Sequence, residues 1–238
     1  KMDEDGSLTL ITSDEQADAL YGAGSQLALM VKAFRKNTKS SELWVLPIAD
    51  DSTADAATGT LTFTVAGTDV TPKLATGGTV RLMISGQSCP VNVSAGDSAA
   101  DIATKAAAAI NAKTNLPVTA SASSGVVTLT AKNLGAYGNG IDVRWNHNQG
   151  EVLPDGLSVT LSAMANGGAD PSYEDAKVKE TCAGNWFNMI VIGSSDADNI
   201  TYIKEMLDER WTAIVQQTGV MCFSLNGGAE TDFTTKAN

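Results

Sequence analysis

The residues from 56 to 168 differ in composition from those on either side, and this break limits the possible folds more than any other feature. The segment is rich in Thr, Ser, Val, Ala and Gly. Short runs of alternating apolar and polar residues recur in it, most of them bounded by Gly, Pro or Asn, which is typical of β-strands. These runs are residues 60–66, 79–85, 89–94, 117–123, 125–131, 140–146 and 157–164.

One helix interrupts these strands, over residues 96–113. Ser98 and Asp101 have the spacing of a capping box at its start. Its apolar face carries small side chains, which allow close packing on a sheet. The residues of that face are Ile102, Ala106, Ala109 and Ile110. We therefore predict an α+β, mainly β, sandwich-like domain over residues 56–168.

The residues before this domain predict a strand, a helix and a second strand. Ser13 and Gln16 form a possible capping box, and apolar residues then recur at helical spacing up to Phe34. Gly22 and Gly24 fall inside this amphipathic helix. The apolar run 43–48 that follows is typical of a strand covered on both faces in a parallel sheet.

The residues after the middle domain again alternate between helix and strand. A helix with Asp170 as N-cap ends at Gly184, and a strand follows over 186–193. A second helix begins at Ser195 or Asp196 and leads to a strand at 219–225.

We predict an α/β layer in which strands alternate with helices. Residues 1–55 form the first part of this α/β core domain and residues 169–238 the second part, with the domain of residues 56–168 inserted between them.

The balance of charge argues against two classes of partner. The chain has 16 basic and 27 acidic residues and a net charge of −11. Binding to nucleic acid or to an anionic membrane needs a clustered excess of Lys and Arg, so we expect neither partner.

Metal and disulfide sites are not expected either. Cys89, Cys182 and Cys222 lie far apart, no CxxC occurs, and His147 is the one histidine. The stretch that begins at Asp196 resembles a calcium loop, but Thr201 stands where such a loop needs Gly.

An enzymatic function has little support in the motifs. Neither GxxxxGK[ST] nor GxSxG occurs in the sequence. We expect no catalytic residue and no cofactor. A small-molecule α/β enzyme would place its chemistry at Asp50 or at Ser194 and Ser195, at the ends of predicted strands.

The stretch GAYGNG places Gly135, Gly138, Asn139 and Gly140 between two predicted strands. A phosphate-binding loop needs a helix directly after its glycines, and here a strand follows. We interpret these four residues as a structural turn, a hairpin or a sheet-corner connection in which Gly and Asn supply positive φ.

Tyr137 and Trp145 flank this turn and leave an alternative open. They could form a stacking platform for carbohydrate, in a phage or prophage surface module that binds through its Thr/Ser-rich segment. Large aromatic side chains are more often mostly buried, and on that reading both pack on the sheet.

Several segments, in order along nearly the whole chain, resemble the Mu-like contractile tail sheath protein of phages and prophages. Examples are LITSDEQADALYGAGSQLALMVKAFRKN, GQSCPVNVSAGDSAADIATKAAAAINAK, LGAYGNGIDVR and FNMIVIGSSDADNITYIKEMLDERW. Each segment alone is a weak pattern, and their order makes the set specific.

This resemblance implies a structural subunit rather than an enzyme. Sheath subunits polymerise as hexameric rings around the tail tube, and contraction triggered at the baseplate drives the tube through the host envelope. The resemblance also implies location in the virion tail, after assembly in the cytoplasm of the host bacterium. The inserted domain would lie on the outer sheath surface.

Family members are considerably longer than this chain. We expect a core fragment that lacks most of the C-terminal domain, and that is by itself monomeric or weakly associating.

Overall fold

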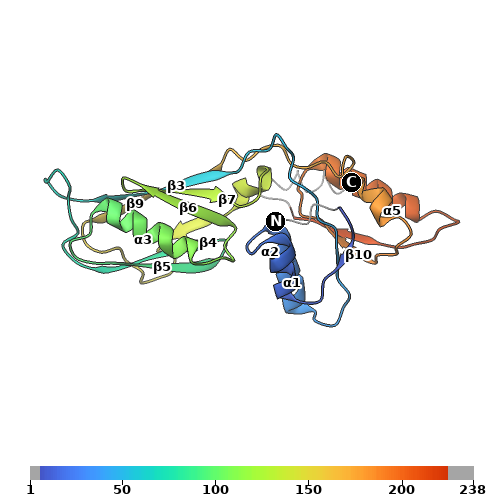
Figure 1. Cartoon of the computed structure of the whole chain (residues 1–238), viewed down its shortest axis with the longest axis horizontal. Helices are drawn as coiled ribbons and strands as arrows, with labels where there is room; N and C mark the ends of the chain where they lie inside the picture. Colours follow the sequence, from blue (N-terminus) through green and yellow to red (C-terminus); the bar gives the residue numbers. More distant parts are fainter. Residues whose placement is uncertain (1–5, 225–238) are drawn as a thin grey trace. The chain divides into compact units, whose positions relative to one another are not determined.

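The computed structural model describes residues 6–224 (Figure 1). Over this range the fold is mixed α/β, with several small sheets and five α-helices. The chain divides into two compact units, which are described separately. The first unit contains the residues up to Ala54 and those from Ala169 onward, and the second unit contains Asp55–Gly168.

The first unit begins with a small antiparallel sheet and two helices. Strand β1 (Thr9–Leu10) pairs with β2 (Trp44–Val45), and between them lie α1 (Asp14–Tyr21) and α2 (Gln26–Asn37). The Ser13 hydroxyl accepts a hydrogen bond from the Gln16 amide at 3.1 Å, so the predicted helix start is confirmed.

The prediction of one continuous helix is wrong. Gly22 and Gly24 have φ of 84° and 81°, a left-handed conformation that ends α1. Ser25 then starts α2, because its hydroxyl accepts a hydrogen bond from the Ala28 amide at 3.2 Å.

The predicted strand at 43–48 is also much shorter than expected. Only Trp44 and Val45 pair, and their partner strand is antiparallel. Pro47 has no amide hydrogen to give to a ladder, so pairing stops before it. Leu46 and Ile48 pack instead on the hydrophobic cluster that contains α5.

The rest of the first unit contains α4 (Val178–Cys182), β10 (Met189–Val191), α5 (Ala197–Arg210) and β11 (Val220–Cys222). Strands β10 and β11 are parallel. Asp196 caps α5, because its carboxylate accepts hydrogen bonds from the amides of the second and third residues that follow it. The prediction of a helix cap at this position is confirmed.

The predicted helix start at Asp170 is wrong, because α4 begins only after Lys177, which has a left-handed φ of 51°. The residues before α4 are not helical, and the side chain of Asn199 holds their backbone in place. Its oxygen accepts a hydrogen bond from the Tyr173 amide at 2.8 Å and its nitrogen donates one to the Pro171 carbonyl at 2.9 Å.

The second unit contains two antiparallel sheets and one long helix. The orders of the strands are β6-β7-β3-β9 and β5-β4-β8. Each of the seven strands predicted in this region is present, six of them with changes of one or two residues at their ends. The bounds of the strands are β3 (Thr58–Val65), β4 (Gly78–Ile84), β5 (Gln87–Val93), β6 (Val118–Ser123), β7 (Val126–Ala131), β8 (Val143–Trp145) and β9 (Leu157–Ala165). The strand predicted over 140–146 is much shorter than expected, because only Val143–Trp145 pair with a neighbouring strand.

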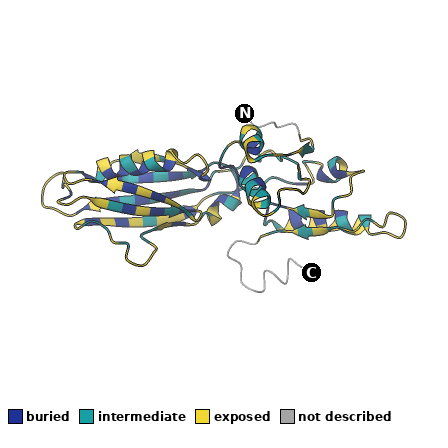
Figure 2. Ribbon diagram, turned by 90° about the horizontal axis from the view of Figure 1, so that it is seen from below, coloured by how far each residue is buried: buried dark blue, intermediate teal, exposed yellow. Residues whose placement is uncertain are grey.

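Helix α3 (Ala99–Asn111) packs against β6 and β5, which are edge strands of the two sheets (Figure 1). The predicted capping box is confirmed, since the Ser98 and Asp101 side chains each accept from the other's backbone amide. Both sheets and α3 share one hydrophobic core. Leu61, Leu82 and Ile102 represent the two sheets and the helix in it, and none is more than 1% exposed. Figure 2 shows buried residues alternating with less buried ones along the strands of this unit.

Candidate functional site

The glycine-rich turn connects β7 with β8, which belong to different sheets. It is therefore a connection between sheets and not a hairpin. Residues Ala136–Gly140 form one short 3-10 helix, named η1, which sequence analysis did not predict.

Only one of the four turn residues has a positive φ, namely Gly135 at 110°. Gly138 is required for a different reason. A Cβ atom on Gly138 would lie 2.8 Å from the Cβ of Ala57 and 3.0 Å from the Cβ of Ala131. The prediction that Gly and Asn supply positive φ thus holds for Gly135 and is wrong for the other three residues of the turn. Close packing accounts for Gly138.

The turn contacts the two places where the chain enters and leaves the second unit. The carbonyl of Asp55 accepts hydrogen bonds from the Gly135 amide at 3.0 Å and from the Gly168 amide at 3.4 Å. The Asp55 amide donates to the Gly168 carbonyl at 3.2 Å. We call this arrangement of residues 55–57, 135–140 and 167–168 the junction clasp.

The side chain of Asn139 completes the junction clasp. Its nitrogen donates to the Gly167 carbonyl at 2.9 Å, and its oxygen accepts from the Gly167 amide at 2.8 Å. The Gly135 and Gly138 amides donate to carbonyls inside the junction clasp, so they do not converge on an outside anion. The hydrogen bonds of the junction clasp therefore join backbone segments of the second unit to one another.

The aromatic residues beside the turn do not form an exposed pair. Trp145 is half-buried and packs against the shared core. Tyr137 is half-buried in η1, and its hydroxyl oxygen is buried. A stacking platform for sugars would need one face of each ring to lie open to solvent side by side.

Charged side chains gather near β8 without forming a deep site. Arg144 pairs with Asp142 at 2.8 Å and lies 3.2 Å from the His147 ring. Hydrogen bonds from the Asn148 side chain and amide, with Arg81 nearby, lower the pKa of the Glu151 carboxyl from its ordinary value. These groups are typical of a solvated loop.

The positions considered for an enzyme have structural partners in the first unit. The Ser194 hydroxyl accepts hydrogen bonds from the Asp196 amide at 3.1 Å and the Asn199 side chain at 3.2 Å, and thereby supports the start of α5. Asp50 is half-buried and belongs to the segment that follows β2 in the sequence.

The described residues contain neither a metal-binding cluster nor a helix that could span a membrane. Within residues 6–224 no cluster of three His, Cys, Asp or Glu side chains has the arrangement of a metal site. No helix in this range has the length and apolar character needed to span a membrane. Cys89 and Cys182 are buried thiols, and burial raises the pKa of each.

The first unit has one exposed apolar surface that was not predicted from the sequence. Met189, Val191 and Val220 share one side of the β10–β11 sheet and are 58%, 53% and 59% exposed. Ile190 and Met221 face the other way and pack on the cluster with α5. We call the exposed side the β10–β11 face. Apolar runs such as residues 189–191 are typical of strands covered on both sides, so the open side had no signal in the sequence.

Comparison with known proteins gives the decisive observation. No family model matches the chain. The sequence is 34% identical over 233 residues, 98% of the chain, to the Mu-like prophage FluMu tail sheath protein of Haemophilus influenzae. The chain is a homologue of this tail sheath protein. The resemblance predicted from the sequence is confirmed. The chain spans 46% of the length of this relative.

Proposed function

We propose that the chain is part of a structural subunit of a contractile phage tail sheath. The single observation that carries this proposal is the match to a tail sheath protein along 98% of the chain. The subunit polymerises as hexameric rings around the tail tube and contracts to drive the tube through the host envelope. Its role is structural and not enzymatic, and its location is the virion tail.

The partners in this proposal are further sheath subunits, the tail tube protein and the baseplate. The β10–β11 face supports such contacts. Parallel sheets are normally covered on both faces, and exposed apolar patches mark protein contacts. The energy for contraction would come from the difference between two packings of the subunits, because a packed interface has discrete stable arrangements.

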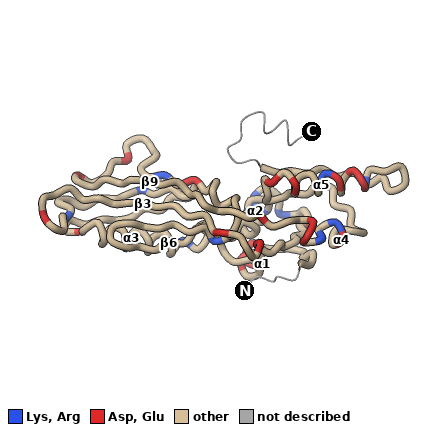
Figure 3. Tube along the Cα trace, turned by 90° about the horizontal axis from the view of Figure 1, so that it is seen from above, with Lys and Arg blue, Asp and Glu red and all other residues tan. Residues whose placement is uncertain are grey.

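We also propose that the second unit is a sandwich-like domain inserted into an α/β core and carried on the outer sheath surface. Its near-neutral charge supports a role separate from the core. Asp55–Gly168 contains seven acidic and six basic residues, whereas the rest of the chain contains 20 acidic and 10 basic residues. Figure 3 shows acidic residues along α5 in the first unit.

Electron microscopy of the full-length gene product tests the main proposal. We expect tubes or stacked rings. Particles without any ring or tube order, in a sample shown to be folded, would contradict a sheath function.

Deletion of residues 56–168 from the full-length product tests the placement of the second unit. A short linker from Asp55 to Ala169 should suffice, because the Asp55 and Gly168 backbones are hydrogen-bonded to each other. We expect rings to assemble still. Loss of assembly by a folded deletion variant would show that the second unit makes necessary ring contacts.

A further inference from the structure

Two Asn-Gly pairs lie together in the junction clasp. Residues 6–224 contain only these two, Asn139–Gly140 and Asn166–Gly167. The two hydrogen bonds between Asn139 and Gly167 join one pair to the other. Asn is a chemically labile residue. Its side chain is attacked most readily by the backbone nitrogen of a following Gly, because Gly has no Cβ to hinder the approach. The junction clasp therefore brings the two most labile dipeptides of the described chain into direct contact.

The fold favours both residues of the second pair in spite of their lability. Asn166 follows β9 directly and has a φ of 66°, in the left-handed region that Asn adopts more readily than most residues. A Cβ on Gly167 would overlap the Gly135 carbonyl oxygen. The same Cβ would lie 3.0 Å from Oδ1 of Asn139 and 3.1 Å from the Cβ of Ala57. The exit of the second unit is therefore built from Asn followed by Gly for reasons of backbone geometry and close packing.

The attacking group of the second pair is held, while the group it would attack is not. Asn166 is exposed, and its side chain makes no hydrogen bond with any of residues 6–224. The Gly167 amide nitrogen donates its hydrogen to Oδ1 of Asn139 at 2.8 Å. The Gly167 carbonyl accepts from the Asn139 side chain at 2.9 Å, so the backbone of Gly167 is held on both sides. Its nitrogen can therefore turn toward the Asn166 side chain only when the junction clasp opens.

Asn139 is less suited to react within its own pair. Its side-chain oxygen and nitrogen are both bonded to Gly167. Attack by the Gly140 nitrogen would require the side chain to give up both hydrogen bonds. Asn139 thus acts on its neighbour pair as a positioning residue, and Asn166 carries the group that reacts.

We propose that Asn166 is a site of spontaneous deamidation, and that Asn139 controls its rate by holding the Gly167 amide. When the junction clasp opens, the Gly167 nitrogen loses its proton and forms a bond to Cγ of Asn166. The bond from Cγ to the side-chain nitrogen breaks, and that nitrogen takes up a proton and leaves as ammonia. Water then opens the cyclic succinimide, at one carbonyl to give Asp and at the other to give isoaspartate. Water is the co-reactant, and no group is oxidised or reduced.

Either product weakens the junction clasp. Isoaspartate inserts one additional backbone carbon before Gly167, and both products add a negative charge to the turn. Gly168 is bonded through its amide and its carbonyl to Asp55, so Gly167 is not free to shift and keep both bonds to Asn139. Deamidation therefore loosens the exit of the second unit. This inference goes beyond the sheath proposal and is measurable on the chain alone, whatever the chain assembles into.

Ageing of the full chain in mildly alkaline buffer tests the proposal. Peptide mass spectrometry with chromatographic separation of Asp and isoaspartate measures the rate of deamidation at Asn166. Asn139→Ala removes the two hydrogen bonds that hold Gly167. The matched control is Asn92→Ala, at an exposed Asn of β5 whose side chain accepts a hydrogen bond from Thr79 at 3.1 Å. Asn166→Gly is the negative control, because Gly adopts positive φ and has no side chain to deamidate.

We expect Asn139→Ala to raise the rate at Asn166 about tenfold, because the loss of two neutral hydrogen bonds raises the open population by about that factor. Asn92→Ala should age like the unchanged chain. Asn139→Asp should raise the rate less than Asn139→Ala, since its carboxylate still accepts from the Gly167 amide. Equal rates at Asn166 in Asn139→Ala and the unchanged chain would overturn the proposal. Deamidation of Asn139 before Asn166 in the unchanged chain would overturn the choice of site, and equal rates in the two Asn139 variants the role of the Gly167 hydrogen.

A second measurement needs no variant of Asn139 and therefore holds even where Asn139→Ala fails to fold. In the unchanged chain, the rate at Asn166 in unfolding concentrations of guanidinium chloride should exceed the rate in the folded chain at least about tenfold. Equal rates in the two states would overturn the proposal. Ageing should also reduce hydrogen-exchange protection of β3 amides in the unchanged chain and leave Asn166→Gly as it was. An equal loss of protection in both would contradict the weakening of the junction clasp by deamidation.

Discussion

Asn139 and Gly167 exchange two hydrogen bonds, at 2.9 Å and 2.8 Å, through the side-chain amide of one and the backbone of the other. The side-chain amide of Asn139 thus makes the two hydrogen bonds that the backbone of a neighbouring strand would otherwise make with Gly167. This pair joins η1 to the segment through which the chain leaves the second unit. Together with the bonds of Asp55, it connects the entry and exit segments to the same turn.

Asn139→Ala removes both hydrogen bonds, whereas Asn139→Asp keeps an acceptor for the Gly167 amide and loses the donor to its carbonyl. We expect the Ala variant to lower the free energy of unfolding of the second unit by about 1–2 kcal/mol and the Asp variant by less. Hydrogen exchange of amides in β3 measures this. Equal protection in all three proteins would show that the pair adds no stability.

Gly138→Ala should destabilise the second unit by about 1–3 kcal/mol, because the added methyl group overlaps Ala57 and Ala131 in a packed core. Gly138→Val should have a larger effect. Gly168→Ala in the same junction clasp is the control, since a Cβ there meets nothing within 4 Å. Urea unfolding of the variants compares them. Loss of a bound small molecule from a normally folded Gly138→Val variant would contradict the structural role.

The second unit could be predicted from the sequence at the level of its strands and its helix. Its strands alternate apolar and polar residues cleanly, as in β3, and its helix begins at a complete capping box. Local pattern and tertiary burial agree there, so the periodicity of the sequence is sufficient.

The first unit was harder to predict, because single residues override the periodicity. Gly22 and Gly24 divide a helix whose apolar spacing continues across them, and Pro47 stops a strand inside an apolar run. The Asn199 side chain fixes residues from a distant part of the sequence, which no local pattern reveals. The junction clasp could not be predicted for the same reason, since the residues that it joins are far apart in the sequence.

The β10–β11 face should bind apolar dyes. Val220→Lys puts a charge on a residue that is already 59% exposed, so the fold should tolerate it. We expect lower fluorescence of the dye ANS and less association at high protein concentration, because the apolar area is interrupted. Ile214→Lys is the control, at an exposed apolar residue outside β10 and β11. Equal dye binding in both variants would mean that the face is not the apolar surface that the dye detects.

Asn111 protects the edge of the four-stranded sheet. Its side-chain nitrogen donates to the Ala120 carbonyl at 2.8 Å and its oxygen accepts from the Ala120 amide at 2.9 Å, so α3 covers the middle of edge strand β6. Asn111→Ala exposes these backbone groups, and we expect faster aggregation in light scattering. Adding Ala122→Lys, on the exposed part of β6, should slow it again. Aggregation that is unchanged by Asn111→Ala would show that the edge is protected by other means.

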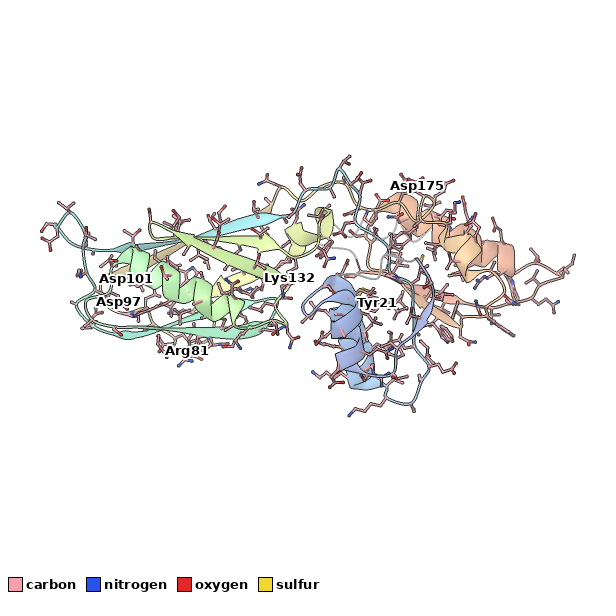
Figure 4. The ribbon with its side chains drawn as sticks, viewed as in Figure 1. Tyr21, Arg81, Asp97, Asp101, Lys132 and Asp175 are labelled. Carbon is pink, nitrogen blue, oxygen red and sulfur yellow. The ribbon has the colours of Figure 1, made fainter. Side chains whose placement is uncertain are left out.

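Acid should weaken the start of α3, where Asp97 and Asp101 lie (Figure 4). Hydrogen bonds from Lys105 and the Ser94 amide lower the pKa of Asp97, and those from the Ser98 amide and hydroxyl lower the pKa of Asp101.

A carboxyl whose pKa is lower in the folded chain binds protons more readily when unfolded. Its contribution to stability is therefore complete above the ordinary value of about 4, and is lost as the pH falls through the lowered pKa. We expect the free energy of unfolding of the second unit, measured in urea, to fall below about pH 4. This fall should be smaller in Asp101→Asn. Asp69→Asn, in the exposed loop between β3 and β4, is the control and should keep the full loss. An identical dependence on pH in Asp101→Asn and the unchanged chain would remove this carboxylate from the acid response.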